Sequence, residues 1–212
     1  MSASTIPRSA GAGLLVYGLG TAVAYLGSGT PGGSYRPTMI HDYVARGHWA
    51  TAFVLWYVGA LAALGLLVVG AALRRTQRDG DLLWGLSVGA TAISVTGAFV
   101  AGGIEVAVAE GGHVVQSGVS APVVYALGEI GNLLAVCAPA LLVGVAALVL
   151  AARSALPGWL RAFSAVAGVC GILAPLFLTY FVFTLWTVVA GITLMAARRD
   201  AARVLEPDAA FA

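Results

Sequence analysis

Long apolar runs separated by short polar segments dominate the chain. Four runs cover residues 10–27, 49–73, 82–104 and 123–152, and a further apolar stretch extends from residue 162 to residue 197. A helix needs about 20 apolar residues to cross a bilayer, so each of the four runs predicts one membrane span. The final stretch would form a helix of about 54 Å, which is much longer than a bilayer is thick. We therefore predict a turn near Pro175 and Thr179-Tyr180, which gives spans at 158–177 and 179–197.

Composition places the chain among integral membrane proteins. Hydrophobic residues make up 60% of the 212 residues and charged residues only 9%, and the mean hydropathy is +0.94. A soluble domain needs far more charge to cover its surface. The sequence thus predicts one all-α transmembrane domain over residues 1–212, a six-helix bundle surrounded by membrane lipid. The first run is interpreted as a retained span rather than a signal peptide, because only Arg8 precedes it and no good cleavage site follows it.

The arginines predict the orientation of the bundle. All eleven basic residues are arginine, and the abundance of Ala, Gly and Val suggests GC-rich coding and a bacterial source. If the N-terminus is cytoplasmic, nine arginines lie on the inner side and only Arg36 and Arg46 on the outer side. The positive-inside rule then places both termini in the cytoplasm, in a multi-pass protein of the bacterial inner membrane. The net charge of +2 is too small to indicate nucleic acid as a partner.

Carboxylates lie at the outer ends of the predicted spans. Glu129 belongs to the stretch YALGEIGNLL, and counting about 20 residues outward from the inner end near Ala151 places it at the outer edge of the hydrocarbon. Glu105 closes the third span at the same level, and Asp42 lies in the outer loop above. An ionisable residue in a span is costly and commonly functional. Glu129 is therefore the candidate catalytic acid, facing the interior of the bundle, with Glu105 or Asp42 as a second carboxylate.

Aromatic and polar residues at helical spacing extend this outer layer toward the centre of the membrane. If the faces that carry them converge, they line an aromatic pocket with a carboxylate near its mouth. The candidate substrate-binding residues are Tyr17 and Tyr25 on the first span, Trp49, Phe53, Trp56 and Tyr57 on the second, Tyr125 and Asn132 on the fourth, and Tyr180 on the sixth.

Each of these features also has a purely structural interpretation. Glu129 is equally consistent with a residue that reaches the headgroups or holds Tyr17 or Tyr25 by a hydrogen bond. Aromatic faces in a membrane bundle are more often packing surfaces and interfacial belts than ligand sites. Cys137 and Cys170 lie within predicted spans and are interpreted as small apolar residues rather than a disulfide.

A metal site is the main chemical alternative for the outer layer. His41 and His48 would share a helix face, and four further groups could complete zinc or copper ligation, namely Glu105, Glu110, His113 and Glu129. These residues are scattered over three segments without a tight local signature, so we predict no metal and no other cofactor. The sequence contains no CxxC, HExxH, GxSxG or Walker pattern, which disfavours the familiar hydrolases and ATPases.

The second half of the chain resembles a known group of proteins. The resemblance rests on the stretches LGEIGNLLAVCAPALLVGVAALVLAARSALPGWLRAFSAVAGVCGILAPL and LWTVVAGITLMAARR. These are similar to small six-span bacterial membrane proteins catalogued as a domain of unknown function, with a Gly/Asn-containing fourth helix, an LPGWL inner loop and a final Leu-Trp helix that ends in Arg. The resemblance covers about the last 90 residues and, more loosely, the whole chain. It implies a six-helix bundle but supplies no activity and no catalytic residues.

Three classes of function are compatible with these features. The first is a membrane-embedded enzyme that acts on a lipophilic, isoprenoid-like substrate, as integral-membrane terpene cyclases do, with a carboxylic acid that protonates an alkene or epoxide and aromatic faces that stabilise the cation. The second is a small-solute binding or transport subunit, similar to the substrate-binding components of vitamin transporters, which docks a partner membrane subunit. The third is a non-catalytic sensory or accessory protein. We favour the enzyme as the working hypothesis.

Overall fold

The computed structural model describes residues 6–27, 49–114, 121–154, 156–176 and 178–204, and every element in this part of the chain is helical. The elements are α1 (Arg8–Gly27), α3 (Trp49–Ala63), α4 (Gly65–Thr76), α5 (Gly80–Val114), α6 (Ala121–Asn132), η1 (Leu133–Cys137), α7 (Ala138–Arg153), α8 (Gly158–Ile172), η2 (Ala174–Leu176) and α9 (Leu178–Val204). The prediction of an all-α fold is therefore confirmed for the described residues.

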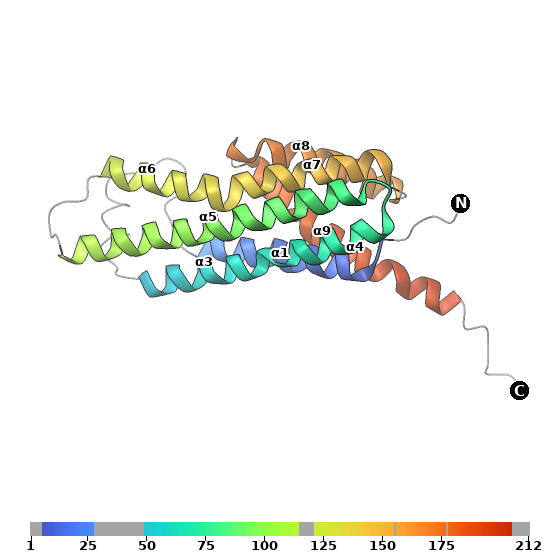
Figure 1. Cartoon of the computed structure of the whole chain (residues 1–212), viewed down its shortest axis with the longest axis horizontal. Coiled ribbons are helices and arrows are strands. Elements are labelled where there is room, and N and C mark those ends of the chain that lie inside the picture. Colours follow the sequence, from blue (N-terminus) through green and yellow to red (C-terminus); the bar gives the residue numbers. More distant parts are fainter. Residues whose placement is uncertain (1–5, 28–48, 115–120, 155, 177, 205–212) are drawn as a thin grey trace, which may run out of the picture.

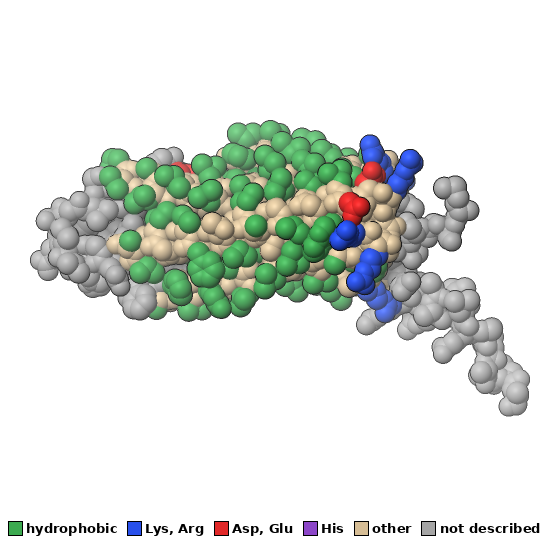
Figure 2. Space-filling model, viewed as in Figure 1, with side chains coloured by type: hydrophobic (Ala, Val, Ile, Leu, Met, Phe, Trp, Pro, Cys, Tyr) green, Lys and Arg blue, Asp and Glu red, His purple; other side chains and the backbone are tan. Residues whose placement is uncertain are grey.

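Five helical segments are long and apolar enough to cross a membrane: Arg8–Gly27, Phe53–Thr76, Gly80–Ala107, Ala126–Arg153 and Leu178–Ala196. The apolar helix α8 is shorter, with 15 residues. Large apolar side chains cover the lateral surface along the length of the bundle, as Figure 2 shows, whereas alanine and glycine dominate the interior. This distribution is the reverse of that in a soluble domain and identifies a multi-pass membrane protein.

The helices form a ring that follows the order of the chain. Helix α1 packs against α3 and α4, these pack against α5, and α5 packs against α6, η1 and α7. Helix α8 then packs between α7 and α9, and α9 returns to contact α1, which closes the ring. Figure 1 shows that α1 begins and α9 ends at the same end of the bundle. The centre of the ring is thus the common interior of all the apolar helices.

Glycines bring neighbouring helices into backbone contact around this ring. A Cβ atom built on Gly65 of α4 would lie 2.5 Å from the carbonyl oxygen of Gly13 in α1. A Cβ atom on Gly11 of α1 would lie 2.7 Å from the carbonyl oxygen of Gly191 in α9. A Cβ atom on Gly144 of α7 would likewise lie 2.7 Å from the carbonyl oxygen of Gly168 in α8. Lipid offers no hydrophobic gain for helix association, so such close approach is a principal source of stability.

The hairpin near the end of the chain lies where the sequence predicts it. Helix α8 ends at Ile172, η2 contains Pro175, and α9 begins at Leu178. Because Pro175 lacks an N–H group and restricts the residue before it, the α-helix cannot continue through this position. The chain reverses direction here, and α9 lies against α8, as the hydrogen bond that Trp186 of α9 donates to Ser164 of α8 shows.

Three of the predicted spans differ from the observed helices. Helix α9 continues to Val204, seven residues beyond the predicted end at residue 197. Helix α5 has 35 residues and continues to Val114, ten residues beyond the predicted end of the third span at residue 104. At about 52 Å it is longer than the hydrocarbon core, and Figure 1 shows it extending together with α6 at one end of the bundle. The second span is interrupted at Leu64, whose N–H bonds the carbonyl of Leu61 at 3.1 Å in a tightened turn next to the Gly13–Gly65 contact.

The described arginines collect at one end of the bundle, which we call the arginine end (Figure 2). There Arg74 pairs with Asp81 at 2.8 Å and Arg153 pairs with Asp79 at 2.6 Å. Glu105 lies 24 residues beyond Asp81 on α5, or about 36 Å along the helix axis. We call the opposite end, which carries Glu105 and Glu129, the carboxylate end.

Candidate functional site

Glu105 is a buried carboxylate at the carboxylate end. Only 5% of its surface is exposed, and it continues a buried face of α5 that contains Ala101 and Gly102. A Cβ atom on Gly102 would lie 3.3 Å from the Cβ atom of Trp56 in α3, and Ala101 is similarly close to Gly131 in α6. Helix α5 is thus held between α3 and α6 one turn below Glu105. A carboxylate buried at such a position in a membrane bundle is a candidate functional group.

Glu129 is half-buried on α6. Its carboxylate is close enough to the Tyr25 hydroxyl of α1 and to the Cys137 thiol to interact electrostatically with both. This position fits a functional carboxylate that faces the interior. It fits equally well the simpler interpretation in which Glu129 holds Tyr25 in place.

Two hydrogen-bond donors are buried in the same half of the bundle. Trp56 is 4% exposed and Asn132 is 3% exposed. Neither Trp56 Nε1 nor Asn132 Nδ2 has a hydrogen-bond partner among the residues that the structure describes. Leaving a buried donor unpaired costs about 1–3 kcal/mol, and such groups in native proteins commonly mark a functional site or a bound water. The donors could accommodate an acceptor atom of a ligand.

Aromatic rings connect this region to the centre of the bundle. Tyr25 contacts Tyr180 edge to face at a centroid distance of 6.0 Å, Tyr180 lies 6.1 Å from Phe183, and Phe183 lies 6.0 Å from Trp186. We call these four rings the aromatic column. Tyr17, 2% exposed, is also buried and interacts with Tyr180. The structure therefore brings the predicted residues Tyr17, Tyr25 and Tyr180 together.

Other predicted lining residues are not brought to the interior. Phe53 is 42% exposed and Tyr57 is 46% exposed, and Tyr57 contacts Phe99 of α5 at 6.0 Å on the outer surface. The physical reason is that α3 directs Gly59 and Ala60 inward, and Trp56 lies between these two directions on the helix surface. Phe53 and Tyr57 lie beyond Ala60, on the side away from Gly59. Asp42 and the side chains of Trp49 and Tyr125 lie outside the described residues.

A π-helical turn, which the sequence analysis did not find, separates α6 from α7. The N–H of Ala138 bonds the carbonyl of Leu133, which is the i→i+5 spacing of a π-helix. The turn lies directly before Pro139, whose ring and missing N–H oppose a regular α-helix at this point. Gly97 of α5 packs against the backbone of Leu134 in the turn and leaves no space for a side chain. Pro139 and Gly97 are the residues in the sequence that could have indicated this turn. Such π-helical turns are frequent at functional sites.

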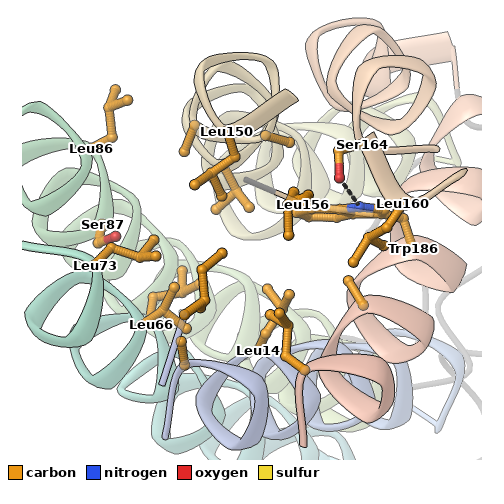
Figure 3. Close-up of a pocket in the computed structure, with 18 residues that line it drawn as sticks. Leu14, Leu66, Leu73, Leu86, Ser87, Leu150, Leu156, Leu160, Ser164 and Trp186 are labelled. Atoms are coloured by element: carbon orange, nitrogen blue, oxygen red, sulfur yellow. Dashed lines mark hydrogen bonds between the residues drawn. The ribbon is translucent and has the colours of Figure 1, made fainter. Parts of the chain in front are cut away.

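The structure also contains an interior cavity in the arginine half that the sequence did not indicate. It has a volume of about 40 Å³. Figure 3 shows side chains converging on it from around the ring, with the hydrogen bond from Trp186 Nε1 to Ser164 Oγ at 3.0 Å on one side. Its lining comprises Ile6, Ala10, Leu14, Leu66, Val69, Leu73, Leu86, Ser87, Val143, Ala146, Ala147, Leu150, Leu156, Leu160, Ser164, Trp186, Ala190 and Leu194. Trp186 belongs to both the cavity and the aromatic column.

The described residues contain no group of three or more His, Cys, Asp or Glu side chains that could hold a metal ion. His41 and His48 and the side chains of Glu110 and His113 lie outside the described residues, so the proposed set of ligands is not placed. Cys137 and Cys170 are free thiols, as expected for small apolar residues within spans.

Comparison of the chain with protein-family models, with curated proteins and with solved structures finds no match. The resemblance to the six-span membrane proteins of unknown function therefore stays an expectation, and function must be argued from the geometry of the chain itself.

Proposed function

We propose that the chain is a membrane-embedded enzyme that carries out acid–base chemistry on a lipophilic, isoprenoid-like substrate at the carboxylate end. The observation that carries this proposal is the burial of Glu105 in a membrane bundle, on the same end as the half-buried Glu129. A carboxylate away from water is costly in a membrane protein and is retained where it performs a task.

Glu129 is the proton donor in this proposal. It is half-buried, so water can return the proton that it gives away, whereas Glu105 is buried and acts as the second carboxylate. The O–H bond of the Glu129 carboxylic acid breaks as a C–H bond forms on an alkene carbon, or an O–H bond on an epoxide oxygen. The cation that results is stabilised by ring faces such as those of Tyr25 and Tyr180, and it is discharged by loss of a proton or addition of water.

Protonation of carbon has a direct isotopic test. The purified protein, reconstituted in vesicles, is incubated in D₂O with squalene or with its terminal epoxide, and the products are analysed by mass spectrometry. We expect isomerised or cyclised products, with one deuterium bound to carbon where squalene is the substrate. Glu129→Gln keeps the size and hydrogen-bonding capacity of the side chain but removes the acid, so product formation should fall by at least about 100-fold. Asp81→Asn at the arginine end is the matched control and should leave the rate unchanged.

A second candidate is a solute-binding subunit without chemistry, which the unpaired donors of Trp56 and Asn132 favour. In that case squalene epoxide binds and is recovered unchanged, and Asn132→Leu weakens binding. Equal product formation by wild type and Glu129→Gln would contradict the enzyme proposal. A Glu129→Gln protein that no longer inserts, while Asp81→Asn does, would indicate that Glu129 only supports the fold.

We also propose that both termini are cytoplasmic and that the membrane is a bacterial inner membrane. The support is the excess of arginine on one side of the chain, nine against two, and the collection of the described arginines at one end of the bundle (Figure 2). A cysteine that replaces Gln77 in the α4–α5 turn should resist membrane-impermeant thiol reagents in intact cells, and one that replaces Gly112 should react. Labelling at Gln77 from outside would reverse the orientation.

A further inference from the structure

Two buried hydrogen-bond donors point into the ring at the carboxylate end. Residues two positions apart on an α-helix point about 200° apart, so they lie on nearly opposite sides of the helix. Val54 and Val58 of α3 are exposed, and Trp56 lies between them in the sequence. On α6, Ile130 is exposed in the same way, two residues before Asn132. Both donors therefore face away from lipid and toward the interior of the bundle.

The two donors lie at one level of the bundle, on the two helices that hold α5 there. A Cβ atom on Gly102 of α5 would lie 3.3 Å from the Cβ atom of Trp56, and a Cβ atom on Gly131 of α6 would lie 3.1 Å from that of Ala101. Ala101 and Gly102 are consecutive in α5, and Asn132 follows Gly131. Trp56 Nε1 and Asn132 Nδ2 thus belong to the same layer of the interior, and neither has a hydrogen-bond partner among the described residues.

The two carboxylates lie next to this layer. Glu105 is three residues beyond Gly102 on α5, and Glu129 is three residues before Asn132 on α6. Residues three apart are neighbours on a helix surface and are separated by about 4.5 Å along the axis. A ligand atom in the layer of the two donors would therefore lie about one helical turn from the level of the carboxylates.

The chemistry of the donors restricts the ligand. An indole N–H and an amide NH₂ can only donate, so the ligand atom that they bind must be an acceptor. The oxygen of an epoxide has two lone pairs and can accept from both donors. An alkene has none, and a hydrocarbon chain in this layer would leave both buried donors without a partner, which is unfavourable. The donors therefore distinguish between the two substrates that the proposed protonation allows.

We infer that Trp56 and Asn132 determine specificity by binding the oxygen of an isoprenoid epoxide, in preference to a hydrocarbon isoprenoid. The inference rests on the proposed function for the position of the substrate, but it concerns binding and does not depend on proton transfer from Glu129. It also gives the substrate a direction, because its oxidised end must reach the layer of the two donors.

The indole of Trp56 reports the expected bond, because an indole proton resonance moves downfield when the N–H donates. The full chain with isotopically labelled tryptophans is titrated with squalene epoxide in detergent micelles, and the Trp56 resonance is the one that Trp56→Phe removes. We expect a saturable downfield shift of this resonance in wild type and in Glu129→Gln, which keeps the epoxide intact. The Trp186 N–H already donates to Ser164 at 3.0 Å, so its resonance should stay in place. Equal Trp56 shifts with squalene, the matched ligand without oxygen, would overturn the inference.

Competition between squalene epoxide and squalene for the full chain in nanodiscs measures the preference itself. Wild type should bind the epoxide at least about tenfold more tightly. Asn132→Leu and Trp56→Phe each remove one donor and should each lower this preference to about threefold or less, so that one variant suffices if the other does not fold. Trp186→Phe removes an indole that is already paired and is the matched control, which should keep the full preference. An undiminished preference in the donor variants would overturn the role of Trp56 and Asn132.

Failure of this inference can be told apart from failure of the proposed function. Deuterated products from squalene, without any preference for the epoxide, would overturn the inference and leave the acid–base chemistry standing. A Trp56 shift and a preference of about tenfold, without any product, would support the inference and contradict the enzyme.

Discussion

The two halves of the bundle treat their buried tryptophans differently. In the arginine half, Trp186 donates its indole N–H to Ser164 at 3.0 Å. In the carboxylate half, Trp56 is buried to the same degree, but its N–H has no hydrogen-bond partner among the described residues. The first arrangement contributes to stability, whereas the second opposes it. The proposed ligand site in the carboxylate half would supply the acceptor that this donor lacks.

The helix contacts differ in the same way. The Gly–Gly pairs lie in the arginine half, where they close a ring around an apolar cavity. The carboxylate half contains Glu105, the π-turn and the extension of α5 beyond the hydrocarbon. The arginine half thus contains the Gly–Gly contacts, and the carboxylate half contains the buried carboxylate on which the proposed function depends. The predictions below would separate these two roles or show that the division is wrong.

The largest effect should come from Gly13 in the arginine half. In Gly13→Leu the new side chain would meet the backbone of Gly65, so α1 and α4 must separate, and the loss of stability should exceed about 3 kcal/mol. Gly85→Leu is the matched control, because nothing lies within 4 Å of a Cβ atom at Gly85. Thermal melting in detergent by circular dichroism would measure both. Similar melting temperatures would mean that the glycine contacts do not hold the ring.

An effect of intermediate size is expected when the stabilities of the two tryptophan variants, Trp186→Phe and Trp56→Phe, are compared. Trp186→Phe removes a satisfied hydrogen bond, and such bonds in membrane proteins are worth about 0.6 kcal/mol on average and up to about 1.7 kcal/mol. Trp56→Phe removes an unpaired donor and should restore part of the roughly 1–3 kcal/mol that its burial costs. Both changes replace indole by phenyl, so their difference isolates the N–H group. Comparable melting of the two variants would indicate that Trp56 has a partner after all.

The smallest effect should come from the ion pairs at the arginine end. Arg153 is 64% exposed and Asp79 is 20% exposed, so Asp79→Asn should change stability by less than about 1 kcal/mol, and high salt should reduce even that difference. The measurement is thermal melting of the variant and wild type at low and high ionic strength. A loss comparable to that of Gly13→Leu would show that charge pairing, rather than glycine packing, holds this half together.

The helical architecture was predictable from the sequence because span length and apolarity are properties of single segments. The hairpin at Pro175 was predictable for a similar reason, since the geometry of proline acts locally. The inward direction of Tyr17, Tyr180 and Asn132 was also predictable from helical spacing. In each of these cases a residue and its near neighbours determine the outcome.

The remaining features depend on contacts between segments. In a membrane helix both faces are apolar, so polarity does not distinguish lipid from interior, and residue size decides instead. This explains why Phe53 and Tyr57 were assigned to the interior, although only Trp56 lies between Gly59 and Ala60 on the helix surface. The cavity has no sequence signal, because it is a mismatch in packing among six helices. The end of α5 was misplaced because the helix continues past Glu105 through Gly111 and Gly112, although these residues no longer resemble a span.

The π-turn has a consequence for the angular phase of the helix that carries Glu129. A π-helical turn contains one residue more than an α-helical turn. Side chains in α6 therefore point about 100° away from the direction that a regular α-helix continued from α7 would give them. A one-residue deletion within Leu133–Cys137 would convert the turn to regular α-helix and leave the direction of Glu129 unchanged. The same deletion in α7 below Pro139 would rotate Glu129 by about 100°, toward lipid or another helix. Within the helices α6 and α7, tolerance to a one-residue deletion should therefore be confined to Leu133–Cys137.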